Sequence, residues 1–205
     1  MKFAALAPAA ALACCVLAAT AGAKPAHTTK YTYYTVGGGT AQEVYRAMLK
    51  RGPRVNGAKA YASTAATSSQ DGKLMQAKSC RIEDYRLKID FVIRLPKIKN
   101  EKLLPPADRS RWQQFSQFLK KHEETHRAIW LACAAGLERK VRALKAKTCE
   151  AADAKAAALW DAARAACARK HDAFDAAEQK KLMRHPFVKL VYQRSGRTTH
   201  AAKAP

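Results

Sequence analysis

Acidic residues are scarce in this sequence. Its 205 residues include 38 lysines and arginines but only 16 aspartates and glutamates, which gives a formal net charge of +22 at pH 7. No basic stretch is interleaved with aromatic residues as in nucleic-acid-binding motifs, so nucleic acid is the least favoured partner. A solvated basic surface and attraction to anionic envelope polymers or lipid head groups both stay open as explanations of the charge.

Long hydrophobic runs are absent except at the start of the chain. MKFAALAPAAALACCVLAATAGA has one lysine, an apolar stretch broken by Pro8, and small residues before Lys24, which is the pattern of a secretory signal peptide. No later segment is apolar for long enough to cross a bilayer. We expect cleavage after Ala23, leaving 182 residues with a charge of +21 in the periplasm or outside the cell. A lipoprotein anchored through Cys14 is the weaker alternative.

Several common site motifs are also missing. The glycines at 37–39 are followed by neither a GxGxxG pattern nor a Walker lysine, which excludes a phosphate-binding loop there. No CxxC spacing supports a thiolate zinc site. Four cysteines follow the predicted signal peptide, and an even number in an exported chain predicts two disulfides.

The first part of the mature chain has the pattern of a sheet. KYTYYTV, residues 30–36, alternates aromatic and polar residues, and Leu87–Leu95 is apolar at every second position. Weaker strands are expected around KAYASTAATS and KLMQAKSCRI, on either side of Gly72. These segments predict an antiparallel sheet of three or four strands within residues 30–96.

One short helix interrupts these strands. Thr40 and Glu43 form a capping-box pair, and Gly52 with the following proline is a stop signal, so we expect a helix at Ala41–Arg51.

The second part of the chain is helical. Pro96 and the prolines at 105–106 indicate a linker, after which Ser110 with Gln113 can cap a long helix. Apolar residues then recur every three or four positions, and a turn is expected near Thr148 before a second long helix.

The predicted fold class is α+β, with the small antiparallel sheet and short helix followed by a long antiparallel helical hairpin over residues 108–183. We expect a single domain over residues 24–190 and a basic, disordered tail over residues 191–205.

The hairpin also predicts how the cysteines pair. Positions equally far from the turn lie side by side, which joins Cys133 to Cys167. Cys149 lies at the turn, roughly 24 Å or more from either at 1.5 Å per residue, beyond the reach of a disulfide. The remaining pair, Cys80–Cys149, would tie the sheet to the tip of the hairpin. Free thiols are the alternative.

The stretch HEETH, residues 122–126, carries the chemistry. Residues four apart share one face of a helix, so His122 and His126 can bind one ion. Glu123 follows His122 directly on the helix, so its carboxylate can reach a water bound to that ion. This arrangement is why HExxH is a zinc hydrolase pattern. Two partly buried structural histidines are the alternative.

A third ligand must come from elsewhere, because the HExxHxxGxxH extension is absent. Glu178 should face His122, since both lie eleven residues from the predicted disulfide across the hairpin. His185, just past the second helix, is the competing ligand. Asp175 is expected to orient a histidine ring without touching the ion, and it ranks behind Glu178 and His185 as the ligand itself. His171 is expected to be a packed interior residue.

These residues resemble a known bacterial family. YTYYTVGGGTAQEVYRAMLKRGP, SCRIEDYRLKIDFVIRLP, RWQQFSQFLKKHEETHRAIW and FDAAE are similar, in this order, to the predicted secreted zinc-dependent proteases catalogued as domain of unknown function 922. The resemblance covers roughly residues 30–187. It implies a periplasmic or secreted, zincin-like hydrolase with His122 and His126 as zinc ligands and Glu123 as catalytic base.

Two departures from the family concern the site. Members usually carry Thr-x-His-Gly shortly after the aspartate matched by Asp175, where this chain has AAEQKK. Members also tend to have tryptophans in the first strands, where this chain has YASTAATSS. The first departure concerns the third ligand and the second concerns the substrate cleft.

The leading hypothesis is an exported zinc metallopeptidase or amidase that acts on a peptide or protein substrate. The alternative is a non-catalytic, basic envelope-binding protein with a structural or vestigial metal site.

Overall fold

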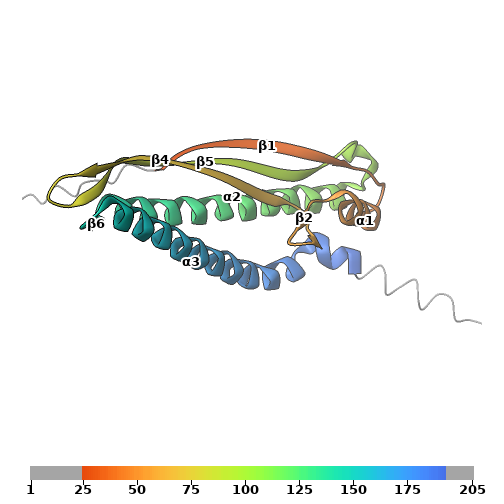
Figure 1. The fold of residues 1–205 in the computed structure, drawn as a ribbon. Helices are drawn as coiled ribbons and strands as arrows, with labels where there is room; N and C mark the ends of the chain where they lie inside the picture. Colours follow the sequence, from red (N-terminus) through yellow and green to blue (C-terminus); the bar gives the residue numbers. More distant parts are fainter. Residues whose placement is uncertain (1–24, 193–205) are drawn as a thin grey trace, which may run out of the picture.

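The computed structural model describes residues 25–192. The predicted signal peptide, its cleavage site and residues 193–205 of the expected tail lie outside these residues. Three long strands form the sheet with one short strand at its end, and two long helices lie against one face of it (Figure 1). The strands of this sheet are β1 (Ala26–Val36), β4 (Ser63–Gln76), β5 (Cys80–Ile98) and β6 (Lys145–Ala146). A separate small hairpin consists of β2 (Arg54–Val55) and β3 (Ala58–Lys59).

The sheet is mixed, so the expectation of an antiparallel sheet is wrong. β5 is its central strand, antiparallel to β4 but parallel to β1, with Ala26 opposite Lys88 and Val36 opposite Ile98. Parallel strands need a crossover connection, and here residues 37–79 provide it. Apolar alternation indicates which face of a strand is buried, but it does not give the direction of the neighbouring strand.

The two weak strands expected around Gly72 are one continuous strand, β4. Gly72 lies at a shift in its register with β5. A Cβ atom at this position would lie 2.8 Å from Ile82 Cγ2, which explains the glycine. The expected boundary at Pro96 is also wrong, because β5 continues to Ile98. The pairing of β5 with β4 ends at Arg94. The missing N–H of Pro96 therefore removes no hydrogen bond between these two strands.

The short helix α1 (Ala41–Arg51) has the predicted bounds. Thr40 accepts a hydrogen bond from the Glu43 N–H, and the Glu43 carboxylate accepts one from the Thr40 N–H, which together form the capping box. Its buried face, with Val44 and Met48, packs into the larger hydrophobic core.

The predicted hairpin consists of α2 (Pro106–Arg142) and α3 (Cys149–Arg184). The expected start at Ser110 is wrong, since α2 begins with a proline in its first turn, where a missing N–H costs nothing. A 3₁₀ turn, η1 (Glu101–Leu103), precedes it. The turn near Thr148 is confirmed, and the Thr148 hydroxyl caps α3 by accepting from the Ala151 N–H.

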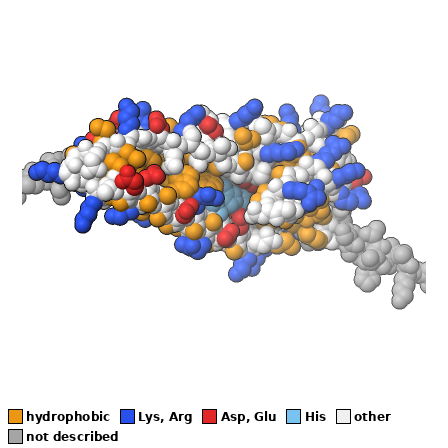
Figure 2. Space-filling view, viewed as in Figure 1, with side chains coloured by type: hydrophobic (Ala, Val, Ile, Leu, Met, Phe, Trp, Pro, Cys, Tyr) orange, Lys and Arg blue, Asp and Glu red, His pale blue; other side chains and the backbone are white. Residues whose placement is uncertain are grey.

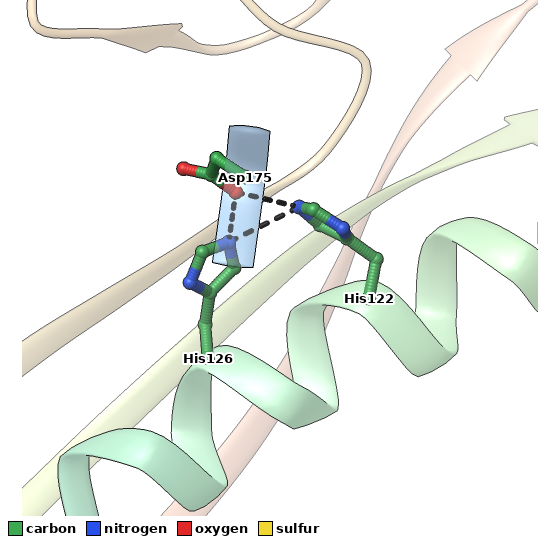
Figure 3. Close-up of side chains that lie close together, drawn as sticks. All are labelled: His122, His126 and Asp175. Carbon is green, nitrogen blue, oxygen red and sulfur yellow. Dashed lines mark hydrogen bonds and ion pairs between the residues drawn. The ribbon is translucent and has the colours of Figure 1, made fainter. Parts of the chain in front are cut away.

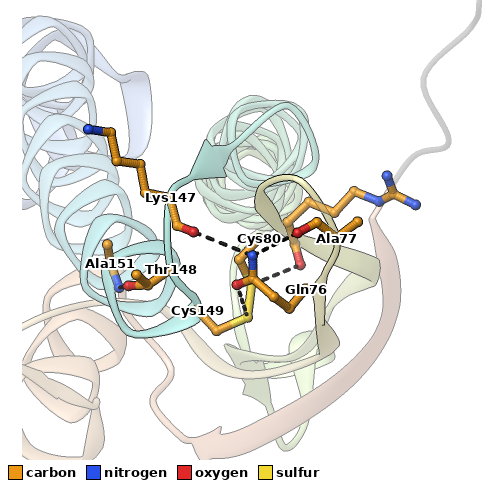
Figure 4. Close-up of a disulfide and its surroundings, with 8 residues drawn as sticks. Gln76, Ala77, Cys80, Lys147, Thr148, Cys149 and Ala151 are labelled. Atoms are coloured by element: carbon orange, nitrogen blue, oxygen red, sulfur yellow. Dashed lines mark hydrogen bonds between the residues drawn. A yellow bond between two sulfur atoms is a disulfide. The ribbon is translucent and has the colours of Figure 1, made fainter.

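Both disulfides pair as expected from the hairpin. Cys133–Cys167 joins α2 to α3 with a Cα–Cα distance of 5.9 Å, and Cys80–Cys149 joins the start of β5 to the start of α3 with 5.0 Å. Figure 4 shows Cys80–Cys149 beside Gln76, whose amide donates to the backbone oxygens of Ala77 and Lys147. The tip of the hairpin is therefore fastened to the β4–β5 turn.

The hydrophobic core has two main parts. One lies around Trp112 and Phe115 at the α1 end, and the other lies beneath the hairpin around Phe91 and Leu137. Residues 186–192 form a further helix, and its Val191 is buried, so the first two residues of the expected tail are helical. Within residues 25–192, none of the helices combines the length and apolar character needed to cross a membrane.

Candidate metal centre

His122 and His126 lie one turn apart on α2 and point toward the same place (Figure 3). Their Nε2 atoms are 3.1 Å apart, with the ring planes at 80° to each other. Both side chains are largely buried, with exposed fractions of 20 % and 14 %. The spacing of four residues therefore gives the shared face that the sequence predicted.

Asp175 on α3 completes this group from the opposite helix. Its Oδ1 lies 3.3 Å from His122 Nε2 and 2.9 Å from His126 Nε2 (Figure 3). The Asp175 side chain is 54 % exposed, so it forms the outer side of the cluster. Three potential ligand atoms from two helices thus face one point.

The distances among these three atoms fit a single small cation. Ligands about 2.0–2.1 Å from a tetrahedral ion are separated from one another by about 3.3 Å. The three separations here, 3.1, 3.3 and 2.9 Å, are close to that value. Two imidazoles and a carboxylate are also a ligand set that zinc commonly takes in hydrolases.

The cluster lies in an open cleft with a volume of about 510 Å³. The cleft is bounded by α2, by α3, and by the β4 residues Ser63 and Thr64. Figure 2 shows histidine surface inside a hollow on this face, with acidic side chains next to it. Among residues 25–192, no segment on this face covers the histidines, so a ligand can reach them from solvent.

Burial favours the neutral form of the two imidazoles. Desolvation lowers the pKa of His122, and Asp175 opposes that shift. Desolvation also lowers the pKa of His126, where Asp175 opposes the shift and His122 adds to it. Neutral imidazole is the form that binds a metal ion.

Glu123 is buried beside the two histidines and lines the same cleft. The Thr64 hydroxyl lies 2.8 Å from Glu123 Oε2 and 2.9 Å from the Glu123 backbone oxygen, and it donates to one of them at a time. Burial raises the pKa of Glu123 to about 7, Thr64 opposes the shift, and Asp175 adds to it. A cation at the adjoining imidazoles favours the ionised carboxylate.

His171 has a contact that its expected role as a packed residue did not include. Its Nδ1 lies 2.8 Å from His126 Nδ1, so it fixes the ring of His126 from the side away from Asp175. Burial lowers the pKa of His171, and the neighbouring His126 adds to that effect. Trp130 packs against the ring of His171, with the two ring centroids 5.0 Å apart.

Neither of the two residues ranked as third ligand reaches the histidine pair. Glu178 lines the cleft, but its carboxylate accepts from Lys181 Nζ at 2.6 Å. The ring of His185 packs against Phe115 and Phe118, and its Nδ1 accepts from the Phe187 N–H. Asp175, ranked behind these two as a ligand and expected to orient a ring, is the carboxylate that contacts both imidazoles.

The sequence contained a signal for part of what was missed. His171 and Asp175 are four apart on α3, so they share one helix face just as His122 and His126 do on α2. Thr64 had no comparable signal, because β4 is a polar strand whose distance to α2 depends on the tertiary fold.

Comparison with known proteins gives one match. A family model described as "Bacterial protein of unknown function (DUF922)" matches residues 31–182, which include HEETH and Asp175. No curated protein and no solved structure matches the chain.

Proposed function

The chain belongs to the bacterial family of unknown function DUF922, and for this chain we propose the activity of an exported, zincin-like zinc metallopeptidase or amidase. The observation that carries the proposal is the convergence of His122 Nε2, His126 Nε2 and Asp175 Oδ1 next to a buried glutamate. A substrate of the proposed kind is a peptide or protein.

A shared cation explains this convergence better than hydrogen bonds alone. The three atoms lie within 3.3 Å of one another. If both nitrogens carried protons, the two N–H groups would point into the same small space and repel each other. One divalent cation between them would satisfy all three. When bound there, zinc supplies Lewis acidity that polarises a carbonyl oxygen and lowers the pKa of water.

Three protein side chains have further tasks in this proposal. Glu123 accepts a proton from the attacking water while the water oxygen bonds to the substrate carbonyl carbon. Glu123 then delivers that proton to the departing nitrogen as the C–N bond breaks. Thr64 restricts the Glu123 carboxylate to one position by its hydrogen bond. His171 fixes His126 through Nδ1, as a partner on the far side of a ligand imidazole does.

Export is the second part of the proposal. The N-terminal pattern of a signal peptide supports it, and two disulfides are typical of chains that fold in an oxidising compartment. The periplasm or the extracellular space provides such conditions.

A non-catalytic, envelope-binding function is the second candidate, and the charge of +22 is the observation that favours it. Lysine and arginine side chains are spread over the face shown in Figure 2. In that case the protein would adhere to anionic polymers in a salt-dependent way, and any zinc would be fully coordinated, without an exchangeable water.

The proposed activity is tested by Glu123→Gln in the mature, zinc-loaded chain. We expect zinc content to stay at one ion per chain while hydrolysis of peptide substrates falls by about 10²–10⁴-fold, the usual contribution of a general base. Zinc is measured by metal analysis and hydrolysis with a panel of fluorogenic peptides and denatured protein.

Glu124→Gln is the matched control. Glu124 is the next residue along α2, but it accepts from the Tyr31 hydroxyl at 2.6 Å and does not line the cleft. This variant should keep full activity. Undiminished hydrolysis by Glu123→Gln, or none by the zinc-loaded wild-type chain, would refute the proposed enzyme.

A further inference from the structure

A second pocket lies next to the metal cleft. It has a volume of about 240 Å³ and is enclosed by β4, β5, α2 and α3. Its lining is apolar apart from Ser68 and Arg164. Figure 2 shows hydrophobic surface directly beside the histidine-lined hollow.

Small residues keep this pocket open. Ala66 and Ser68 of β4, Ala134 of α2 and Ala163 of α3 surround a space that larger side chains would fill. The other apolar walls are formed by the Cys133–Cys167 disulfide, two partly buried indoles, and three aliphatic side chains: Trp130, Trp160, Leu87, Ile89 and Leu137. Apolar surface left open in this way lowers stability and is typical of binding sites.

The pocket adjoins the metal cleft. Trp130 lines both, and its ring packs on His171, which contacts His126. β4 also runs past both, with Ser63 and Thr64 at the cleft and Ala66 and Ser68 at the pocket. A ligand extended along β4 would therefore meet the two in succession.

The spacing defines which part of a substrate enters the pocket. Thr64 and Ser68 are four residues apart, about 13 Å along a strand. Along α2, Cys133 lies seven to eleven residues beyond the two histidines, about 10–16 Å at 1.5 Å per residue. At about 3.3 Å per residue, the distance along the strand equals about four residues of an extended peptide, and the distances along the helix equal about three to five.

The volume defines the size of the occupant. About 240 Å³ is less than the ≈300–1,000 Å³ of pockets that hold a whole drug-sized ligand, and it suits a single large side chain.

We propose that this pocket binds a large apolar side chain of the substrate, about three to five residues from the bond that lies at the metal centre. This inference rests on the proposed function, since it assigns the substrate class of the same cleft. Ala163 and Ser68 determine the specificity by staying small, and the substrates are chains with an aliphatic or aromatic residue at that distance.

Tryptophan fluorescence tests the inference without catalysis. The chain has three tryptophans, of which Trp130 and Trp160 line the pocket and Trp112 is buried in the other core. The probe is a series of Gly/Ser peptides with one 4-bromophenylalanine, moved stepwise along the peptide, because bromine quenches indoles at short range. The protein is mature Glu123→Gln with zinc present, which leaves the peptide intact.

We expect saturable quenching by the brominated peptides and none by an all-Gly/Ser peptide. Ala163→Leu should lower the affinity by about tenfold or more, since added methylenes take the place of the ligand. Ser68→Leu fills the pocket from the opposite wall and should do the same. Ala162→Leu, at an exposed neighbouring position of α3, should leave the affinity unchanged.

Other results would overturn the inference. These are quenching that both filled variants retain in full, or equal binding of the Gly/Ser peptide. Saturable, Ala163→Leu-sensitive quenching in a chain whose wild type hydrolyses nothing would remove the proposed enzyme and leave the pocket. Hydrolysis without any preference for the apolar residue would remove the proposed role of the pocket and leave the proposed enzyme.

Discussion

At the scale of single residues, the metal centre depends on side chains that would not themselves touch the ion. His171 contacts Nδ1 of His126, and Thr64 contacts the carboxylate of Glu123. Each contact fixes one reactive group in one orientation before any ligand arrives. Such prearranged contacts are what a site needs to bind a metal ion tightly.

The role of Asp175 gives the first prediction at this scale. Asp175→Asn keeps the size of the side chain but removes the charge that lies 2.9 Å from His126 Nε2. We expect zinc affinity to fall by about 100-fold or more. Losing a residue that only hydrogen-bonds to a metal ligand lowers metal affinity by about 10–100-fold, so loss of a ligand should cost at least that much. Chelator competition measures it.

Glu178→Gln is the control for that experiment. Glu178 lines the same cleft but pairs with Lys181 instead of the imidazoles. Because Glu178 acts on His122 through its charge alone, its substitution should lower zinc affinity much less than Asp175→Asn does. If Glu178→Gln weakened zinc binding and Asp175→Asn did not, the original ranking of Glu178 as third ligand would be restored.

Sequence reasoning reached the histidines but not the carboxylate for a physical reason. His122 and His126 are related by one helix, so a fixed period places them on one face. Asp175 and Glu178 are related to them across the hairpin, where both are close by. The choice between them depends on side-chain length and helix packing, which the period of a helix does not specify.

At the scale of elements, the hairpin positions the site. The site residues come from α2 and α3, and Cys133–Cys167 joins these helices 34 residues apart in sequence. The sequence predicted the pairing of these helices well, because the apolar period and the cysteine positions both pointed to it, although the predicted cap at Ser110 was wrong. Thr40 and Glu43 likewise predicted α1 from local contacts alone.

Removal of each disulfide gives the second prediction. Replacing both Cys133 and Cys167 by serine should lower the free energy of unfolding by about 4 kcal/mol in the chain-entropy model. It should also weaken zinc binding, because the bond fixes the register that brings Asp175 to the histidines. Urea unfolding and chelator competition measure the two effects.

The Cys80/Cys149 double serine variant is the matched control. Its sequence separation of 69 residues gives a similar loss of about 4 kcal/mol, but it lies at the far tip of the hairpin. Zinc affinity should change much less. Equal loss of zinc affinity in both variants would show that stability alone, and not hairpin register, controls the site.

At the scale of the whole molecule, the chain is a sheet backed by two long helices, with its larger core at the α1 end (Figure 1). The parallel pairing of β1 with β5 could not be read from the sequence, since it joins strands separated by a helix and a third strand. The helix over residues 186–192 was missed as well. Pro186 is a stop signal for a helix, so we ended the helical part of the chain before it. The buried Phe187 follows directly after this proline.

Phe187 gives the prediction at this scale. Its ring is fully buried and lies 5.4 Å from Trp112 and 5.2 Å from Phe115, between centroids. Phe187→Ala should lower the free energy of unfolding by about 3–5 kcal/mol, the cost of truncating a buried aromatic residue. Met183→Ala, at a 47 % exposed position, should change it by about 0.5 kcal/mol or less. Similar effects of the two substitutions in urea unfolding would contradict this account of the core.

The central claim is that two imidazoles and one carboxylate hold a single zinc ion between α2 and α3. Anomalous diffraction at the zinc edge, from crystals of the mature chain grown with zinc, tests it most directly. The account predicts one strong peak per chain, about 2.0–2.2 Å from His122 Nε2, His126 Nε2 and Asp175 Oδ1. A peak elsewhere, or none in the cleft at full zinc saturation, would contradict it.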